Sequence, residues 1–216
     1  MKKITTILLV NVFVFLMLDN LRSQSQVIEK CGFDHLRSIL LQDSNYLRKE
    51  IDAEQKIAQY ISQSQLKSSN AVYTIPVVVH ILHLGETVGV GTNISDAQIQ
   101  SAITNLNAVY QGQTSGSPVD FEIEFALAQQ DPNCNAHSGI NRINASSVPN
   151  YLTGGVDYFG DGGEADQDVL KDLSRWPEKE YFNIWIVSEI ENNNGGFGIQ
   201  GYANFYQKNF LFKEVK

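Results

Sequence analysis

The sequence predicts an α/β fold, with a twisted, mainly parallel sheet and a backing helix, preceded by a helical segment. Three observations carry this prediction. Residues 72–82 form a continuous run of apolar, mostly β-branched residues, typical of a strand buried on both faces. Residues 95–112 have helical periodicity, and residues 181–187 form a second buried strand. Strands that alternate with helices along a chain favour a parallel sheet.

The first 25 residues have the pattern of a secretory signal peptide. Lys2 and Lys3 give a basic start, residues 4–18 are almost entirely apolar, and Ser23–Ser25 supplies small residues for cleavage before Gln26. The apolar run is shorter than the roughly 20 residues that a membrane-spanning helix needs. We therefore expect a secreted protein, extracellular or periplasmic, without membrane association after cleavage.

Charge and cysteine content exclude two classes of protein. The 216 residues include 16 basic and 24 acidic side chains, a net charge of −8, whereas a nucleic-acid binder needs a basic face. Two cysteines cannot build a disulfide-dense scaffold or a four-cysteine zinc site. We expect no nucleic-acid partner.

The region after the signal peptide divides near residue 70. Residues 33–61 are predicted to be helical, with a weak apolar stripe that includes Leu47, Ile51 and Ile61. A polar run at 62–70 then reads as a linker. The predicted organisation is a signal peptide (1–25), a helical segment with its linker (26–70) and a sheet domain (71–216).

Within the sheet domain, the helix after the first strand has the clearest local signal. Ser95 and Gln98 have capping-box spacing, Ile94 and Ile99 can form a hydrophobic staple, and Gly112 marks the end. This helix is expected to cover one face of the sheet.

Later segments complete the predicted sheet. Residues 121–128 alternate as a half-buried strand near a sheet edge, and a further helix is expected at about 164–174. A returning strand is expected at 198–205, after a turn.

The four histidines do not form a catalytic pattern. None is followed by Glu, so the zinc helix His-Glu-x-x-His is absent, and no catalytic or metal-binding residue is predicted. His80 and His83 would point to opposite faces of a strand. We expect His80 to be a core histidine with a backbone partner and His137 to be solvated.

The acidic residues at 157–168 allow two interpretations. A calcium loop is conceivable because hard cations bind several oxygens, but the spacing does not fit an EF-hand. An acidic surface loop is the favoured interpretation.

Several segments, in order, resemble the start of the catalytic domain of pappalysin-like (cytophagalysin-type) secreted zinc metalloproteases of the metzincin clan. The matching segments are 73–83 with 93–99, 131–132 with 139–142, 176–177 with 181–186, and 201–205. The resemblance implies a zincin-like α+β fold, hydrolysis of protein or peptide substrates, and a zinc cofactor, with calcium as a further candidate.

The resemblance also implies that residues 26–70 are a prosegment. A Cys-Gly pair at Cys31 precedes its charged helix, and a thiolate there could cap the zinc of an intact relative. An idle thiol or a disulfide between Cys31 and Cys134 is the favoured alternative because the chain has no zinc motif.

The resemblance ends before the family's zinc motif, His-Glu-x-x-His-x-x-Gly-x-x-His, and its methionine turn. Residues 206–216 match neither, and the only methionines are Met1 and Met17. We therefore expect a truncated or frameshifted N-terminal part of a metalloendopeptidase, inactive by itself and without a cofactor. The alternative is a secreted, non-catalytic binding or inhibitory module built on the same sheet.

Overall fold

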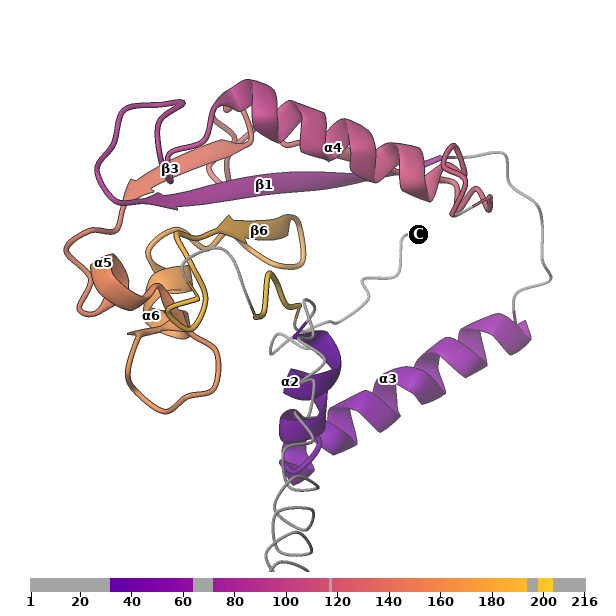
Figure 1. The fold of residues 1–216 in the computed structure, drawn as a ribbon. Helices are drawn as coiled ribbons and strands as arrows, with labels where there is room; N and C mark the ends of the chain where they lie inside the picture. Colours follow the sequence, from indigo (N-terminus) through magenta and orange to yellow (C-terminus); the bar gives the residue numbers. More distant parts are fainter. Residues whose placement is uncertain (1–31, 64–71, 117, 194–197, 204–216) are drawn as a thin grey trace, which may run out of the picture.

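The structure is a computed structural model that describes residues 32–63, 72–116, 118–193 and 198–203 (Figure 1). The predicted signal peptide, most of the predicted linker and residues 204–216 lie outside this range. The elements, in order, are α2 (Phe33–Leu40), α3 (Ser44–Gln63), β1 (Tyr73–His83), α4 (Asp96–Tyr110), β2 (Ile123–Leu127), β3 (Ile140–Asn144), α5 (Tyr151–Gly154), β4 (Val156–Asp157), β5 (Ala165–Asp166), α6 (Gln167–Asp172) and β6 (Phe182–Ile186).

Strand β1 is the centre of a parallel sheet. It pairs in parallel with β2 along its first half, with β3 along its second half and with β6 in the middle. The N–H groups of Tyr73 and Val79 donate to the carbonyls of Glu122 and Gly139, which directly precede β2 and β3. The backbone N–H and C=O groups of odd-numbered β1 residues therefore point toward both β2 and β3. These two strands share one edge of β1, and β6 occupies the other. The predicted α/β fold with a mainly parallel sheet is confirmed.

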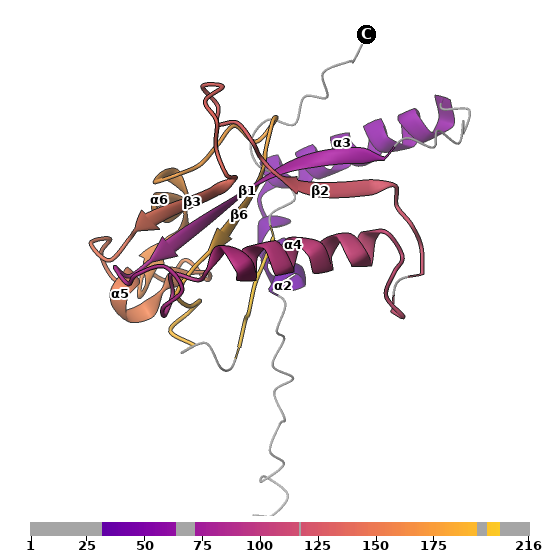
Figure 2. The same ribbon diagram turned by 90° about the horizontal axis from the view of Figure 1, so that it is seen from above.

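Helix α4 lies along one face of this sheet (Figure 2). Its N-terminus has the predicted capping box: the Ser95 side chain accepts from the Gln98 N–H, and the Gln98 side chain accepts from the Ser95 N–H. The core beneath it is built from buried aliphatic residues and one phenylalanine: Val77, Val79, Ile81, Ile99 and Phe125.

The second face of the sheet carries α5, α6 and the N-terminal helix α2. Leu82 of β1, Leu170 of α6 and Leu36 of α2 belong to one buried cluster. Tyr151 is fully buried there; its hydroxyl donates to the Leu82 carbonyl at 2.6 Å and accepts from the Ser188 N–H at 2.9 Å. Helix α2, which precedes the predicted boundary near residue 70, is thus part of this core.

Helix α3 projects away from the sheet (Figure 1). An ion pair between Arg37 of α2 and Glu50 of α3 (2.5 Å) connects the two helices. Several apolar side chains of α3 are exposed, including Ile57 and Ile61. None of the helices that the structure describes is long and apolar enough to cross a membrane.

Several elements differ from the sequence prediction, among them the short helix α5 and the two-residue strands β4 and β5, which were not predicted. The helix expected at 33–61 is divided into α2 and α3 by a turn at 41–43. Strand β3 was not predicted. Of the strand expected at 198–205, residues 198–203 contain only a single β-bridge residue, Gly201, and the last two residues are outside the described range.

Candidate functional site

His80, on β1, is a core histidine. It is fully buried, its Nε2–H donates to Asn183 Oδ1 at 2.9 Å, and its Nδ1 accepts from Asn141 Nδ2 at 3.4 Å. Burial lowers the pKa of His80, although the Asn183 hydrogen bond opposes this shift. The ring stacks on Trp185 with centroids 5.0 Å apart. The predicted core position is confirmed, but the partners are side-chain amides rather than the expected backbone group.

The other three histidines also have local roles. His83 Nδ1 accepts from the Gly85 N–H at 3.1 Å. His35 packs against the rings of Tyr158 and Phe159, with centroid distances of 5.9 and 5.4 Å. The expectation that His137 is solvated is wrong, because its ring is half-buried 4.9 Å from that of Trp176 and its Nδ1 accepts from the Gly139 N–H.

The described residues do not fit the zinc site that the sequence resemblance implies. Catalytic zinc is held by three protein ligands, at least two of them commonly histidine or cysteine, and keeps an open position for water. Of the residues that the structure describes, the one group with three or more potential ligands in reach of each other is wholly acidic. It consists of Asp157, Asp161, Glu164 and Glu191, whose oxygens lie within 4.8 Å of one another.

This acidic group organises the loop at 157–164. The carboxylate of Asp157 accepts from the N–H groups of Gly160 and Gly162, and that of Glu191 accepts from the N–H groups of Tyr158 and Phe159. Burial, together with the carboxylates of Glu191, Asp161 and Asp157, raises the pKa of Glu164. The predicted acidic loop is therefore held by hydrogen bonds from its backbone N–H groups to the carboxylates of Asp157 and Glu191.

The start of the N-terminal segment is docked on the second face of the sheet. The Gly32 N–H donates to the Gly201 carbonyl at 2.9 Å, and the Tyr158 hydroxyl donates to the Gly32 carbonyl. A Cβ at Gly32 would lie 3.0 Å from side-chain atoms of Ile199 and Tyr158, so the contact is close. Cys31 itself lies outside the described residues, and its role as a zinc-capping thiol stays a prediction. Cys134 is a free, exposed thiol.

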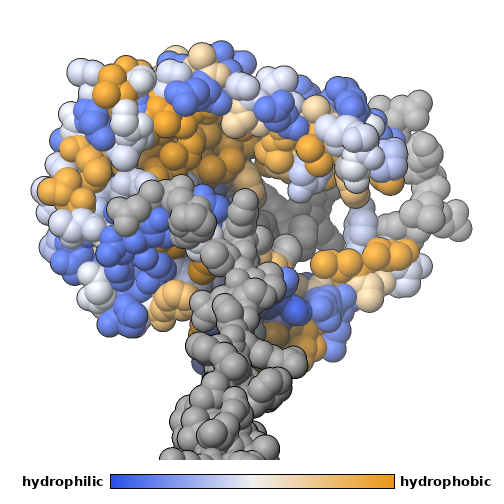
Figure 3. All heavy atoms as spheres, in the orientation of Figure 1, coloured by the Kyte–Doolittle hydropathy of each residue, from blue (hydrophilic) through white to orange (hydrophobic). Residues whose placement is uncertain are grey.

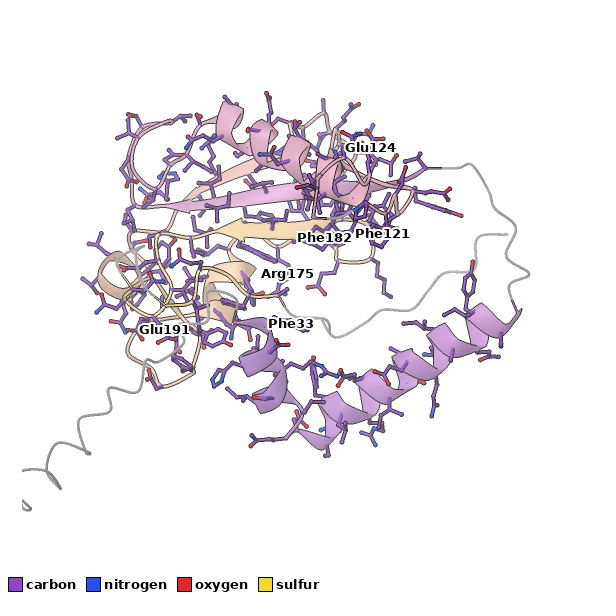
Figure 4. The ribbon with its side chains drawn as sticks, turned by 45° about the vertical axis from the view of Figure 1, so that its right-hand side comes forward. Phe33, Phe121, Glu124, Arg175, Phe182 and Glu191 are labelled. Carbon is purple, nitrogen blue, oxygen red and sulfur yellow. The ribbon has the colours of Figure 1, made fainter. Side chains whose placement is uncertain are left out.

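A cavity of about 640 Å³ follows the edge of β6 that is not paired with β1. Leu106 of α4, with Ile184 and Ile186, lines it on one side of the sheet, and Lys171 and Tyr202 line it on the other. Figure 3 shows the apolar hollow beneath α4. Figure 4 labels Phe182, where β6 begins, and Arg175, on the side of the strand away from α4.

Lys171 is the unusual polar residue of this cavity because it is only 9% exposed. Its ammonium donates to Gln167 Oε1 at 2.8 Å and lies 5.4 Å from the ring centroid of Tyr202 and 6.0 Å from that of Trp185. No carboxylate in the described ranges forms an ion pair with it, whereas Arg175 pairs with Asp172 and Glu178. Burial lowers the pKa of Lys171.

The sequence analysis missed this cavity and Lys171. The run at 181–187 predicted a buried strand, whereas β6 is only half-buried and its first residue, Phe182, is exposed. One edge of β6 is unpaired among the described residues, and nothing in the run indicates this. The one usable signal was Lys171 in an apolar context, directly after Val169 and Leu170.

In the part of the chain that the structure describes, the fold and cavity define an α/β domain with a parallel sheet in which one edge of β6 is unpaired. No family model and no curated protein matches the chain. Solved structures similar to it are of mirolysin, a metallopeptidase of the pappalysin or cytophagalysin type. A promirolysin mutant of Tannerella forsythia is 26% identical, with a TM-score of 0.47, over 82% of this chain and 54% of that one.

Two further structures of mirolysin are also similar. Mature mirolysin of Tannerella forsythia in complex with a cleaved peptide is 29% identical, with a TM-score of 0.39, over 55% of this chain and 43% of that one. Mirolysin in complex with a compound is 29% identical, with a TM-score of 0.36, over 53% and 42%. The chain thus spans about half the length of these proteins.

Proposed function

We propose that this chain is the prosegment and sheet-bearing part of a secreted pappalysin-like metalloendopeptidase and that it does not itself hydrolyse peptide bonds. In this proposal residues 1–25 are a signal peptide, 26–70 a prosegment with its linker, and 71–216 the first half of a catalytic domain. The ordered sequence resemblance supports the family. The docking of Gly32 and Leu36 on the second face supports a prosegment that packs on the domain it precedes.

The observation that carries the absence of hydrolysis is the dispersal of the four histidines. Metal-assisted hydrolysis needs several protein ligands around one ion and an open position for water. Both ring nitrogens of His80 already have amide partners, and the Nδ1 atoms of His83 and His137 accept from backbone N–H groups. His35 packs on aromatic rings of the acidic loop. None of the four belongs to a group of potential metal ligands among the described residues.

Metal analysis combined with a cleavage assay tests this proposal. We expect less than stoichiometric zinc in the purified chain by mass spectrometry and no cleavage of casein or of a mixed peptide library. A known zinc peptidase assayed in parallel provides the positive control. Stoichiometric zinc together with cleavage that 1,10-phenanthroline abolishes would contradict the proposal.

The second candidate function is a secreted binding module, and the edge of β6 that no described strand covers favours it. A strand edge beside an apolar cavity is a typical acceptor for an extended polypeptide. This function requires no metal, and it is compatible with a chain that resembles a peptidase without hydrolysing peptides.

A further inference from the structure

The outer edge of β6 has unused backbone groups. The backbone N–H and C=O groups of even-numbered β1 residues point toward β6. The register pairs Val79 with Ile184 and His80 with Trp185. In a parallel ladder successive residues direct their N–H and C=O groups to opposite edges. The N–H and C=O groups of Phe182, Ile184 and Ile186 therefore face β1. Those of Asn183 and Trp185 point outward, and the same alternation extended by one residue directs those of Val187, which directly follows β6, outward as well. Within the described part of the chain, no backbone hydrogen bond reaches the outward groups of these three residues.

The cavity follows this same edge on both faces of the sheet. Ile184 and Ile186 line it below α4, and Trp185 lines it on the second face. Both faces of a parallel sheet are normally covered by helices. An unpaired strand edge beside apolar surface can hydrogen-bond to another strand. The edge thus has room for an added strand and apolar surface to contact it.

The two sides of the cavity differ in chemistry. Side chains of an added strand alternate between the two faces. Those on the α4 side would meet Leu106, Ile184 and Ile186, which are apolar. Those on the other side would meet the buried ammonium of Lys171. A neutral hydrogen-bond acceptor and two aromatic rings surround this ammonium, and no carboxylate in the described ranges forms an ion pair with it. An opposite charge within a few ångströms favours the charged form of a buried group, so a carboxylate brought to Lys171 would favour its ammonium form.

We propose that the outer edge of β6 accepts an extended segment of a partner polypeptide in which apolar and acidic residues alternate. The segment adds to the sheet as a strand, its backbone bonds to Asn183, Trp185 and Val187, and its acidic side chains approach Lys171. Backbone pairing supplies affinity in this mode, and the alternate side chains supply specificity. The inference rests on the binding role given above as the second candidate function.

A peptide-binding titration tests the proposal. The probe is a fluorescein-labelled peptide of alternating valine and glutamate, titrated with the purified chain and followed by fluorescence anisotropy. We expect saturable binding that weakens about tenfold or more when alternate backbone nitrogens of the peptide are methylated, because each methyl group removes a backbone donor. A peptide of alternating valine and glutamine should bind more weakly than the glutamate peptide.

Two variants locate the binding. Val187→Pro removes an outward N–H without removing a bond to β1, and proline is tolerated at such edge positions. We expect it to weaken binding about tenfold, whereas Val187→Ala, which keeps the N–H, should bind nearly as the parent does. Lys171→Met should retain binding but lose the preference for glutamate over glutamine. Thermal melts of all variants establish that they fold.

Three results would overturn the proposal. The first is binding that is absent or is insensitive to peptide methylation and to Val187→Pro. The second is concentration-dependent self-association in sedimentation experiments that excludes the peptide, which would make a second copy the occupant. The third is binding seen only after residues 204–216 are removed, which would make the chain's own segment the occupant. The zinc and cleavage measurements do not depend on any of these results, so the two proposals can fail separately.

Discussion

Leu36→Ala tests whether the N-terminal helix α2 is part of the folded core. Leu36 is 5% exposed and belongs to the cluster on the second face of the sheet. The substitution removes three carbons, each worth about 0.8 kcal/mol when buried, or about 2.4 kcal/mol in total. The remaining cavity raises the expected loss of unfolding free energy to about 2.5–4 kcal/mol. For a chain of this size the melting temperature should fall by roughly 2–4 °C per kcal/mol.

Leu47→Ala is the matched control because Leu47, on α3, is 41% exposed. The same chemical change there should cost less than about 1 kcal/mol. Both variants are measured by urea unfolding followed by circular dichroism, with the midpoint and the slope fitted separately. Equal losses in the two variants, or a smaller loss for Leu36→Ala, would refute the reasoning that α2 is integral to the core.

Three further substitutions test individual contacts. Tyr151→Phe leaves the Leu82 carbonyl and the Ser188 N–H without their buried partner, and urea unfolding should show a loss of about 1–3 kcal/mol. Hydrogen bonds from its own N–H and from Thr92 lower the pKa of Glu86 to about 2. Its contribution to stability is therefore present above the usual pKa of 4.5 and lost as pH falls from there toward 2, and Glu86→Gln should flatten the melting-temperature profile in that window. Glu164 has a raised pKa, so its carboxylate disfavours folding increasingly as pH rises above 4.5; Glu164→Gln should raise the melting temperature more at pH 7 than at pH 4. An unchanged melting temperature at both pH values would contradict the repulsion inferred for Glu164.

Local sequence patterns predicted α4, β1 and β2 because interactions within a few residues, and the spacing of apolar side chains, determine these elements. The capping box at Ser95 and Gln98 satisfies N–H groups within one turn, so its spacing alone identifies the start of α4. The run of β1 contains no polar alternation, which predicted a central strand buried on both faces. The structure confirms this burial for residues 77–82, whereas the start of the strand, including Tyr73, is exposed. The alternation at 121–128 likewise predicted β2, which the structure places at Ile123–Leu127.

Features that depend on long-range pairing were not predictable in this way. Strand β3 has the sequence Ile-Asn-Arg-Ile-Asn, which has no strand pattern of its own. It forms a strand because its backbone pairs with that of β1. Arg142 within it is held by Asn93 and by the Ile94 carbonyl, nearly 50 positions earlier in the sequence. The amide partners of His80 come from β3 and β6, so their identity required the strand order. That no strand among the described residues pairs with the outer edge of β6 is likewise a property of the assembled sheet.

Hydrogen exchange of individual amides in β6 tests the central claim most directly, because the account depends on an open outer edge that binds a strand. In the free chain, the outward N–H groups of Asn183, Trp185 and Val187 should exchange much faster than the N–H groups of Ile184 and Ile186, which face β1. Addition of the valine–glutamate peptide should slow the outward set alone. Equal protection of both sets in the free chain, or no change on addition of the peptide, would contradict the account.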